Sequence, residues 1–272
     1  MVYEVYDAIG AAVSITDEQL EAAFTRSGQE LEVELIRAME ESRDRRFVPR
    51  LREALSQELQ KARVSAIFGL LTFLDRESIP TLRALRDSLP ERVVSSPIEE
   101  RCIVDAVLVR LEGGAQAALS AFDDETCSPL VRCLLVTNLF ASRLPFERED
   151  VELLVKALDD FVFKRSEWVR ALSASDRNEG VADAVEALSR VAGETDFLSE
   201  LDAHQQRILQ EAGKALLTRR TDELVKESIA EFARGLPEEV GISMLEPILR
   251  KATRGEMKKI LKATLQVFEE KR

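Results

Sequence analysis

The sequence predicts an all-α fold in which helical hairpins stack side by side as an α-solenoid. The main observation is a recurring hairpin motif, because residues 44–55 are echoed by residues 75–85 and the two prolines, Pro49 and Pro80, lie 31 residues apart. Weaker echoes follow at 151–158, 181–188 and 224–229. Units of this length cannot bury their apolar faces alone but can do so when stacked.

The composition suits one long helical array. Hydrophobic residues make up 45% of the 272 residues and aromatic residues only 6%, a mix that suits close helix stacking. Because a stacked array grows in one dimension and needs no second core, we expect a single domain over 1–272. The net charge of −12, from 38 basic and 50 acidic side chains, makes nucleic-acid binding unlikely.

The expected elements follow from helical spacing of apolar residues and from turn signals between them. They are an N-terminal helical cap over 1–26, helix pairs at 28–58, 61–89, 97–123, 128–159, 164–192 and 204–235, and a C-terminal helical cap over 236–272. Connecting loops are expected near 90–96, 142–148, 175–180 and 193–203. The pair of glycines at 113–114 is predicted to form the turn of the third hairpin.

Several helix starts are marked by capping residues. The pairs Ser96-Pro97 and Ser128-Pro129 place a side-chain acceptor at the N-cap and proline at the first helical position. Capping boxes are predicted over 16–19, 27–30 and 243–246. Residues 102–109 are apolar almost all round and predict an interior helix.

The repeated second helix, Val48-Pro49-Arg50-Leu51 and Ile79-Pro80-Thr81-Leu82 after an aspartate-containing turn, resembles the HEAT-repeat family. The likeness is to the short bacterial HEAT-like repeats of the phycobilisome-lyase type and covers roughly 28–235. The resemblance implies a right-handed superhelix of about six hairpins, whose second helices line a concave binding surface. The later hairpins lack the proline and vary in length.

Cysteine and histidine give no sign of catalysis or metal binding. Cys102, Cys127 and Cys133 lack Cys-x-x-Cys spacing and are interpreted as reduced, mostly buried thiols. Cys127 precedes a helix start, where a thiol pKa can fall, but a small apolar filler is the preferred interpretation over a reactive thiol. His204 is the only histidine, which excludes paired-histidine metal sites. Its position suggests a solvated or capping side chain at the start of a helix.

Charged and aromatic side chains give three further candidates for a binding site. Arginines at 43, 45, 46, 50 and 52 cluster near the first turn and could grip phosphate or an acidic segment, although interleaved acidic residues favour a solvated face with local ion pairs. Trp168, beside arginines, suggests either packing or a partner anchor. A basic C-terminal segment could serve as a docking surface or as a simple cap; its residues are Arg250, Lys251, Arg254, Lys258, Lys259 and Lys262.

The sequence therefore predicts a non-enzymatic scaffold that binds another protein, possibly a basic one, through the concave face. No catalytic, cofactor or metal site is predicted, and no apolar run approaches the about 20 residues that cross a bilayer. Together with an acidic start in place of a secretory leader, this predicts a cytoplasmic protein without a membrane partner. The predicted protein-binding residues are Arg50, Arg52, Glu53, Arg83, Arg86 and Asp87. They fall between apolar residues that should face inward, namely Leu51, Leu55, Leu82 and Leu85.

Three alternative functions stay open at this point. An immunity or inhibitor protein for a basic toxin or nuclease would bind with a fast, salt-sensitive association rate. A phycobilisome-lyase-like enzyme would bind a bilin chromophore, and a DNA-glycosylase-like repair protein would bind duplex DNA. The acidic composition makes the last of these unlikely.

Overall fold

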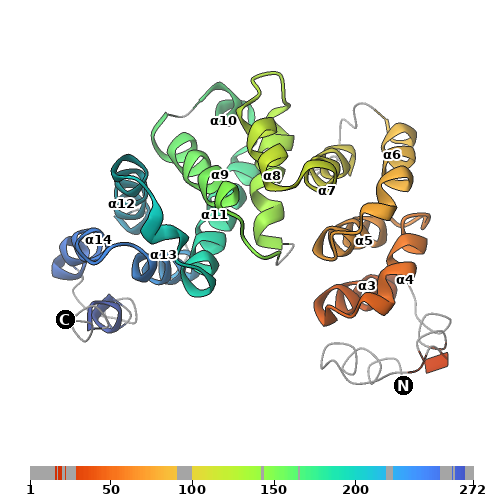
Figure 1. Cartoon of the computed structure of the whole chain (residues 1–272), viewed down its shortest axis with the longest axis horizontal. Coiled ribbons are helices and arrows are strands. Elements are labelled where there is room, and N and C mark those ends of the chain that lie inside the picture. The colour runs from red at the N-terminus through yellow and green to blue at the C-terminus, as the bar shows by residue number, and fades with distance from the viewer. Residues whose placement is uncertain are drawn as a thin grey trace. The chain divides into compact units, whose positions relative to one another are not determined.

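The computed structural model describes residues 16, 18, 19, 22, 29–90, 100–141, 144–164, 166–218, 223–251, 259 and 261–266. These residues lie in helices, turns and connecting segments, and no strand occurs among them (Figure 1). The all-α prediction is therefore confirmed for the described part of the chain. None of its helices is both long and apolar enough to span a bilayer.

The chain divides into two compact units. Unit 1 comprises Met1–Ala117 and Ala141–Leu144, and unit 2 comprises Ala118–Phe140 and Pro145–Arg272. The single solenoid domain stays a prediction from the sequence. The expected N-terminal cap lies almost wholly outside the described residues, as do the loop at 91–96 and the helix starts predicted at Ser27 and Ser96.

Unit 1 contains the first two predicted hairpins and the start of the third. Its elements are α3 (Gln29–Ser42), η1 (Arg45–Phe47), α4 (Val48–Ala54), α5 (Gln60–Thr72), η2 (Arg76–Ser78), α6 (Ile79–Ser88) and the first part of α7 (Glu100–Asp123). Helix α5 packs against both α3 and α4. The helices expected within 28–58 and 61–89 are found, with their prolines in the first turns of α4 and α6.

The core of unit 1 comes from the apolar stripes that the sequence shows. Leu35 and Met39 of α3 and Ile67 and Leu70 of α5 are fully buried. Such stripes exclude water only when two helices face each other, and each buried leucine or isoleucine contributes about 1.5–3 kcal/mol. Packing between successive hairpins therefore stabilises the unit.

The first two hairpins share the same turn in the same register. Arg43 follows α3 and Leu74 follows α5, and both adopt left-handed backbone conformations, with φ of 54° and 49°. These positions, like the prolines, lie 31 residues apart, and each is followed by an aspartate and a short 3₁₀ helix. Asp44 caps the first of these helices, because its side chain accepts from the Arg46 amide at 3.0 Å.

Gly114 divides α7 into two helical segments. Its φ of 69° and ψ of −157° lie in a region that is open essentially to glycine alone. No atom lies within 4 Å of a Cβ built on Gly114, so backbone conformation and not crowding accounts for glycine at this position. The predicted turn at 113–114 is confirmed as a sharp break between two helices.

Unit 2 contains the remaining hairpins in less regular form. After the end of α7 its elements are α8 (Pro129–Ala141, whose last residue belongs to unit 1), α9 (Arg148–Asp159), the π-helical segment η3 (Asp160–Lys164), α10 (Glu167–Ala171), α11 (Ala174–Glu194), η4 (Phe197–Glu200), α12 (Ala203–Thr218), α13 (Glu223–Gly235) and α14 (Glu238–Lys251). Helices α9, α11 and α13 contact one another in that order, and α14 packs on α12 and α13. Each of α9, α11 and α13 is the second helix of a predicted pair.

The loop expected at 175–180 is wrong, because these residues form the first turns of α11. The Ser173 hydroxyl caps this helix by accepting from the Asp176 amide at 3.1 Å. Gly180, inside this segment, is needed for close packing: a Cβ there would lie 2.8 Å from Phe161 Cζ and 2.9 Å from Cys133 Sγ. Tertiary packing, not a turn, explains this glycine.

The predicted helix starts have mixed outcomes. Ser128 accepts from the Val131 amide at 3.2 Å, and Thr16 and Gln19 form a reciprocal capping box, so both of these predictions are confirmed. The start predicted at Ser243 is wrong, because α14 begins at Glu238 and the Ser243 hydroxyl instead donates to the Val240 carbonyl oxygen at 3.0 Å.

Candidate protein-binding surface

The six predicted binding residues lie on the two short second helices of unit 1. Arg50, Arg52 and Glu53 belong to α4, and Arg83, Arg86 and Asp87 belong to α6. Their side chains range from about one-third to two-thirds exposed. We call these six residues the second-helix surface.

The leucines that were expected to face inward are buried in three of four cases. Leu51 and Leu82 are fully buried and Leu55 is buried, whereas Leu85, also expected to face inward, is only half-buried. Because the buried leucines fix how each helix is rotated, the charged residues between them must project outward.

Equivalent arginines in the two helices each reach an acidic residue of the next hairpin. The Arg52 guanidinium donates to Asp75 Oδ2 at 2.7 Å and to Glu77 Oε2 at 2.8 Å. Arg83, 31 residues further on, pairs with Glu112 at the end of the first segment of α7, at 2.9 Å. The paired carboxylates raise the pKa of Arg52, chiefly through the hydrogen bond to Asp75. Two carboxylates of the next hairpin thus orient the Arg52 guanidinium, and one orients that of Arg83.

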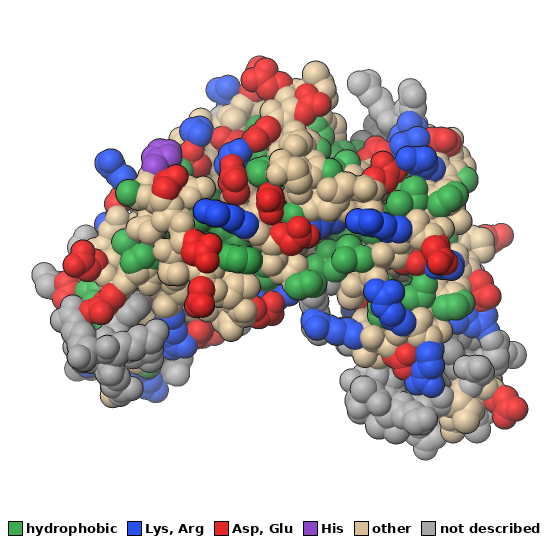
Figure 2. Space-filling model, viewed as in Figure 1, with side chains coloured by type: hydrophobic (Ala, Val, Ile, Leu, Met, Phe, Trp, Pro, Cys, Tyr) green, Lys and Arg blue, Asp and Glu red, His purple; other side chains and the backbone are tan. Residues whose placement is uncertain are grey.

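The other charged residues of this surface pair mainly within their own helix. Arg50 pairs with Glu53 on the same helix. Arg86 pairs with Asp87 at 2.9 Å and lies 3.9 Å from Asp105 of α7. Figure 2 accordingly shows basic and acidic side chains interspersed over the α3–α6 region, and not gathered by sign.

The acidic partners that complete this surface were not predicted from the sequence. Asp75, Glu77 and Glu112 orient Arg52 and Arg83 but lie in the turn or helix end of the following hairpin. A signal was available, since Asp75 repeats the position of Asp44. The sequence alone could not show that Asp44 would pair with its neighbour Arg46 while Asp75 pairs across hairpins.

The cysteines and the histidine show no catalytic arrangement in the described residues. Cys133 is buried, and burial raises the pKa of its thiol to about 12, so it stays protonated at neutral pH. Cys102 and Cys127 are half-buried thiols in no disulfide, so the expectation of mostly buried thiols holds fully for Cys133 alone. His204 is exposed at the start of α12, as predicted, where its amide donates to Asp202 Oδ1 at 2.8 Å.

No group of three or more potential metal ligands gathers anywhere in the described ranges.

Trp168 is a packing residue of unit 2. Its ring is buried and makes edge contacts with Phe122 and Phe161 at centroid distances of 5.4 and 5.2 Å. Its indole N–H donates to Asp160 Oδ2 at 2.8 Å, which satisfies the one polar atom of the side chain. The packing interpretation of Trp168 is therefore confirmed.

The basic C-terminal segment is described only in part. Leu261 and Thr264 are fully buried, and Arg234 of α13 lies 3.5 Å from the Thr264 hydroxyl. Lys259 and Lys262 are exposed. The side chains of the other four predicted basic residues, Arg250, Lys251, Arg254 and Lys258, lie outside the described part.

Comparisons of the chain with protein-family models, with curated proteins and with solved structures each found no significant match. The resemblance to HEAT repeats therefore stays a prediction from the sequence motifs.

Proposed function

We propose that the protein is a cytoplasmic, non-enzymatic scaffold built as a HEAT-like α-solenoid, and that it binds a partner protein through the second-helix surface. The observation that carries the proposal is the common register of Arg52 and Arg83. Each projects from the same position of consecutive second helices and is fixed by an acidic residue of the next hairpin. Repetition of a side-chain position at a regular spacing is how stacked repeats build an extended binding surface.

Two features of packing support the solenoid part of the proposal. In unit 1 the first helices α3 and α5 pack directly on each other, and in unit 2 the second helices α9, α11 and α13 form a continuous row. Contact between corresponding helices of successive hairpins is the pattern that stacking produces.

The charges of the second-helix surface support binding to protein. Arginines already held by carboxylates lose little conformational entropy when a partner docks, and arginine is enriched at binding hot spots. A surface of interspersed signs favours a partner with a complementary mixture of charges over a uniform polyanion such as nucleic acid.

The test is affinity capture from native cells with wild-type protein and with the double variant Arg83→Glu/Arg86→Glu. A matched control is Arg170→Glu/Arg207→Glu, which reverses two exposed charges of unit 2. We expect one partner to be captured by the wild type and the control but not by the unit 1 variant. The captured protein is then titrated against all three purified proteins by calorimetry.

Equal affinity of the partner for all three proteins would contradict the proposal, as would a captured protein that binds only through unit 2. A change in thermal unfolding of the Arg83→Glu/Arg86→Glu variant would instead assign these residues a structural role.

A further inference from the structure

Helices α4 and α6 are copies of each other in sequence but differ in how much of each is buried. In α4 and its C-cap the buried residues are Val48, Leu51, Ala54 and Leu55. In α6, which the structure describes in full, only Leu82 is buried. Because tertiary packing of an apolar face supplies most of the stability of a short helix, α6 is held far more weakly by its apolar side chains than α4.

The repeat of 31 residues shows which apolar anchors of α4 are missing in α6. Leu85 corresponds to Ala54 but is only half-buried. Arg86 corresponds to Leu55, so a guanidinium stands at a position where α4 has a buried leucine. The second copy has therefore exchanged part of its apolar contact for a charge.

Helix α4 packs directly on the first helix of the next hairpin, α5. A Cβ built on Gly69 of α5 would lie 3.0 Å from Leu51 Cδ1, so an alanine there would already crowd Leu51. This close apolar contact fixes α4 to the core of unit 1.

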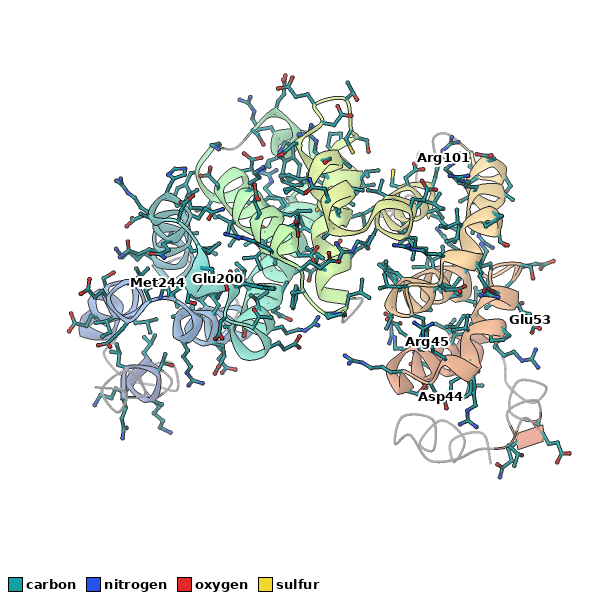
Figure 3. All side chains as sticks on the ribbon, in the orientation of Figure 1. Asp44, Arg45, Glu53, Arg101, Glu200 and Met244 are labelled. Atoms are coloured by element: carbon teal, nitrogen blue, oxygen red, sulfur yellow. The ribbon has the colours of Figure 1, made fainter. Side chains whose placement is uncertain are left out.

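Polar contacts join α6 to the first helix of its own next hairpin, α7. They are Arg83–Glu112 at 2.9 Å, Arg86–Asp105 at 3.9 Å and the bond from Arg101 Nη1 to the Leu89 carbonyl oxygen at 3.2 Å. We call these three contacts the polar latch; Figure 3 labels Arg101, near the start of α7. The side chains of the two ion pairs are between 35% and 56% exposed, so water and salt weaken both pairs.

The turn that precedes α6 is fixed, unlike the helix itself. Asp75 accepts from the Arg52 guanidinium at 2.7 Å. Ser78 is fully buried, and its hydroxyl donates to the Asp75 carbonyl oxygen at 2.7 Å. A movement of α6 that leaves this turn in place is therefore confined to rotation about Ile79 and the residues next to it.

We propose that residues 79–89 form a hinged arm of unit 1, which Leu82 and the polar latch hold closed and which opens while α3, α4 and α5 stay folded. Opening separates one buried leucine and a few partly exposed polar contacts, much less than unfolding the core of the unit would expose. Salt screens the two ion pairs and therefore favours the open arm.

The arm opens without any partner, so its test does not depend on the proposed function. If the proposed partner binding also holds, the two are coupled, because Arg83 and Arg86 belong to both the polar latch and the second-helix surface. An acidic group that binds these arginines competes with Glu112 and Asp105 and favours the open arm.

Hydrogen exchange of the full-length protein at low salt, followed by mass spectrometry, tests the arm directly. After correction for intrinsic rates, the amides of 81–88 should exchange about tenfold or more faster than those of 51–55, the copy in α4, and about a hundredfold or more faster than those of 64–72 in α5. Equal protection of the two copies would overturn the proposal.

The variant Asp105→Asn/Glu112→Gln tests the polar latch without changing α6. It should speed exchange of 81–88 about three- to tenfold and leave 64–72 unchanged. Sodium chloride at about 0.5 M should speed exchange of 81–88 in the wild type by a similar factor, with little further effect on the variant.

The matched control is Asp123→Asn/Glu194→Gln, which removes the acidic halves of two ion pairs in unit 2, with Lys156 and Arg190. It should leave exchange of 81–88 as in the wild type. Unchanged exchange in the latch variant, or the same increase in this control, would overturn the proposal.

The variant Leu82→Ala tests whether the arm opens separately from the core. Loss of the one buried side chain should remove most of the protection of 81–88, while 64–72 stay protected. Equal loss of protection in both segments would show that α6 opens only together with the rest of unit 1 and would contradict a separate arm.

Discussion

The two units bring their helices together by different means. In unit 1, arginines of one hairpin reach acidic residues of the next, as Arg52 does to Asp75 and Arg83 does to Glu112. In unit 2 one such pair joins Lys156 of α9 to Asp123 at the end of α7, at 2.7 Å. Aromatic and glycine contacts join other helices there, such as the edge contacts of Trp168 and the close approach at Gly180. Hairpins of equal length allow the same polar contact to recur at the same position. Hairpins of unequal length pack through contacts that differ from one pair to the next.

The recurrence of ion pairs between hairpins also explains why the second-helix surface lies in unit 1. Charge pairs between hairpins place guanidinium groups at repeated, accessible positions, as in the second-helix surface of unit 1. Aromatic packing in unit 2 places its specific contacts in the interior, where Trp168 and Phe161 are buried.

The largest effect is expected from the buried ion pair that joins α5 to α7 in unit 1. Arg63 pairs with Glu100 through two hydrogen bonds of 2.7 Å and also donates to the carbonyl oxygens of Gln57 and Glu58. Arg63→Met leaves Glu100 buried without its partner and should lower the free energy of unfolding by about 3–5 kcal/mol. Urea denaturation followed by circular dichroism measures this loss.

A double variant, Arg63→Met/Glu100→Leu, sharpens that result. With both charges removed, most of the lost stability should return, because neither buried charge is then unpaired. If the double variant is as unstable as Arg63→Met, the packing of the arginine stem and its bonds to carbonyl groups matter more than the ion pair.

The matching experiment in unit 2 is Gly180→Ala. The added methyl group would crowd Phe161 and Cys133, so we expect a loss of about 1–3 kcal/mol in the free energy of unfolding. Gly193→Ala in the same helix has nothing within 4 Å and should stabilise the protein by about 0.5–1 kcal/mol. Equal effects of the two substitutions would show that α11 is less tightly packed than described.

A smaller effect concerns pH. Burial raises the pKa of Asp183 from 3.8 to about 7, with further contributions from Glu179 and Glu186 on the same helix. Between about pH 4 and 7 the unfolded chain loses this proton while the folded protein keeps it, so the free energy of unfolding falls as pH rises through this window. Asp183→Asn should remove much of that fall and add on the order of 1–2 kcal/mol at pH 8.

Urea titrations of both proteins at pH 4, 6 and 8 measure this difference. Parallel pH profiles for wild type and Asp183→Asn would show that Asp183 ionises as readily in the folded protein as in the unfolded chain.

The smallest effect on stability is expected at the second-helix surface. Arg83→Glu/Arg86→Glu breaks pairs that are largely open to water, so the free energy of unfolding should change by at most about 1 kcal/mol. Urea denaturation checks this alongside the Arg63→Met variant. A loss comparable with that of Arg63→Met would mean that surface ion pairs stabilise unit 1 as strongly as the buried one.

Helix positions in unit 1 could be predicted because their signals are local. Pro49 and Pro80 mark the starts of α4 and α6, and apolar spacing marks the buried faces. Unit 2 was less predictable, because the loop expected at 175–180 is the start of α11, where Gly180 packs closely on Phe161 and Cys133. Sequence patterns report local preference, and tertiary packing overrides them where two helices approach closely.

The candidate surfaces could be predicted only in part. The exposure of Arg83 and Asp87 follows from the spacing of the leucines around them, but the pairing of Arg52 with Asp75 spans 23 residues and depends on how hairpins stack. The left-handed turn at Leu74 had no clear signal, because leucine stands where such a helix end ordinarily has glycine.

The central claim, that the first two hairpins are copies of one stacking unit, is tested most directly by inserting a second copy of residues 44–74 after Leu74. A stacking unit should add its own helices, so the helical circular-dichroism signal should grow in proportion to length, with one cooperative unfolding transition. The control inserts the same 31 residues in shuffled order. If the in-register insertion gains no more helix than the shuffled one, or unfolds the protein, the two hairpins are not interchangeable copies and the account is contradicted.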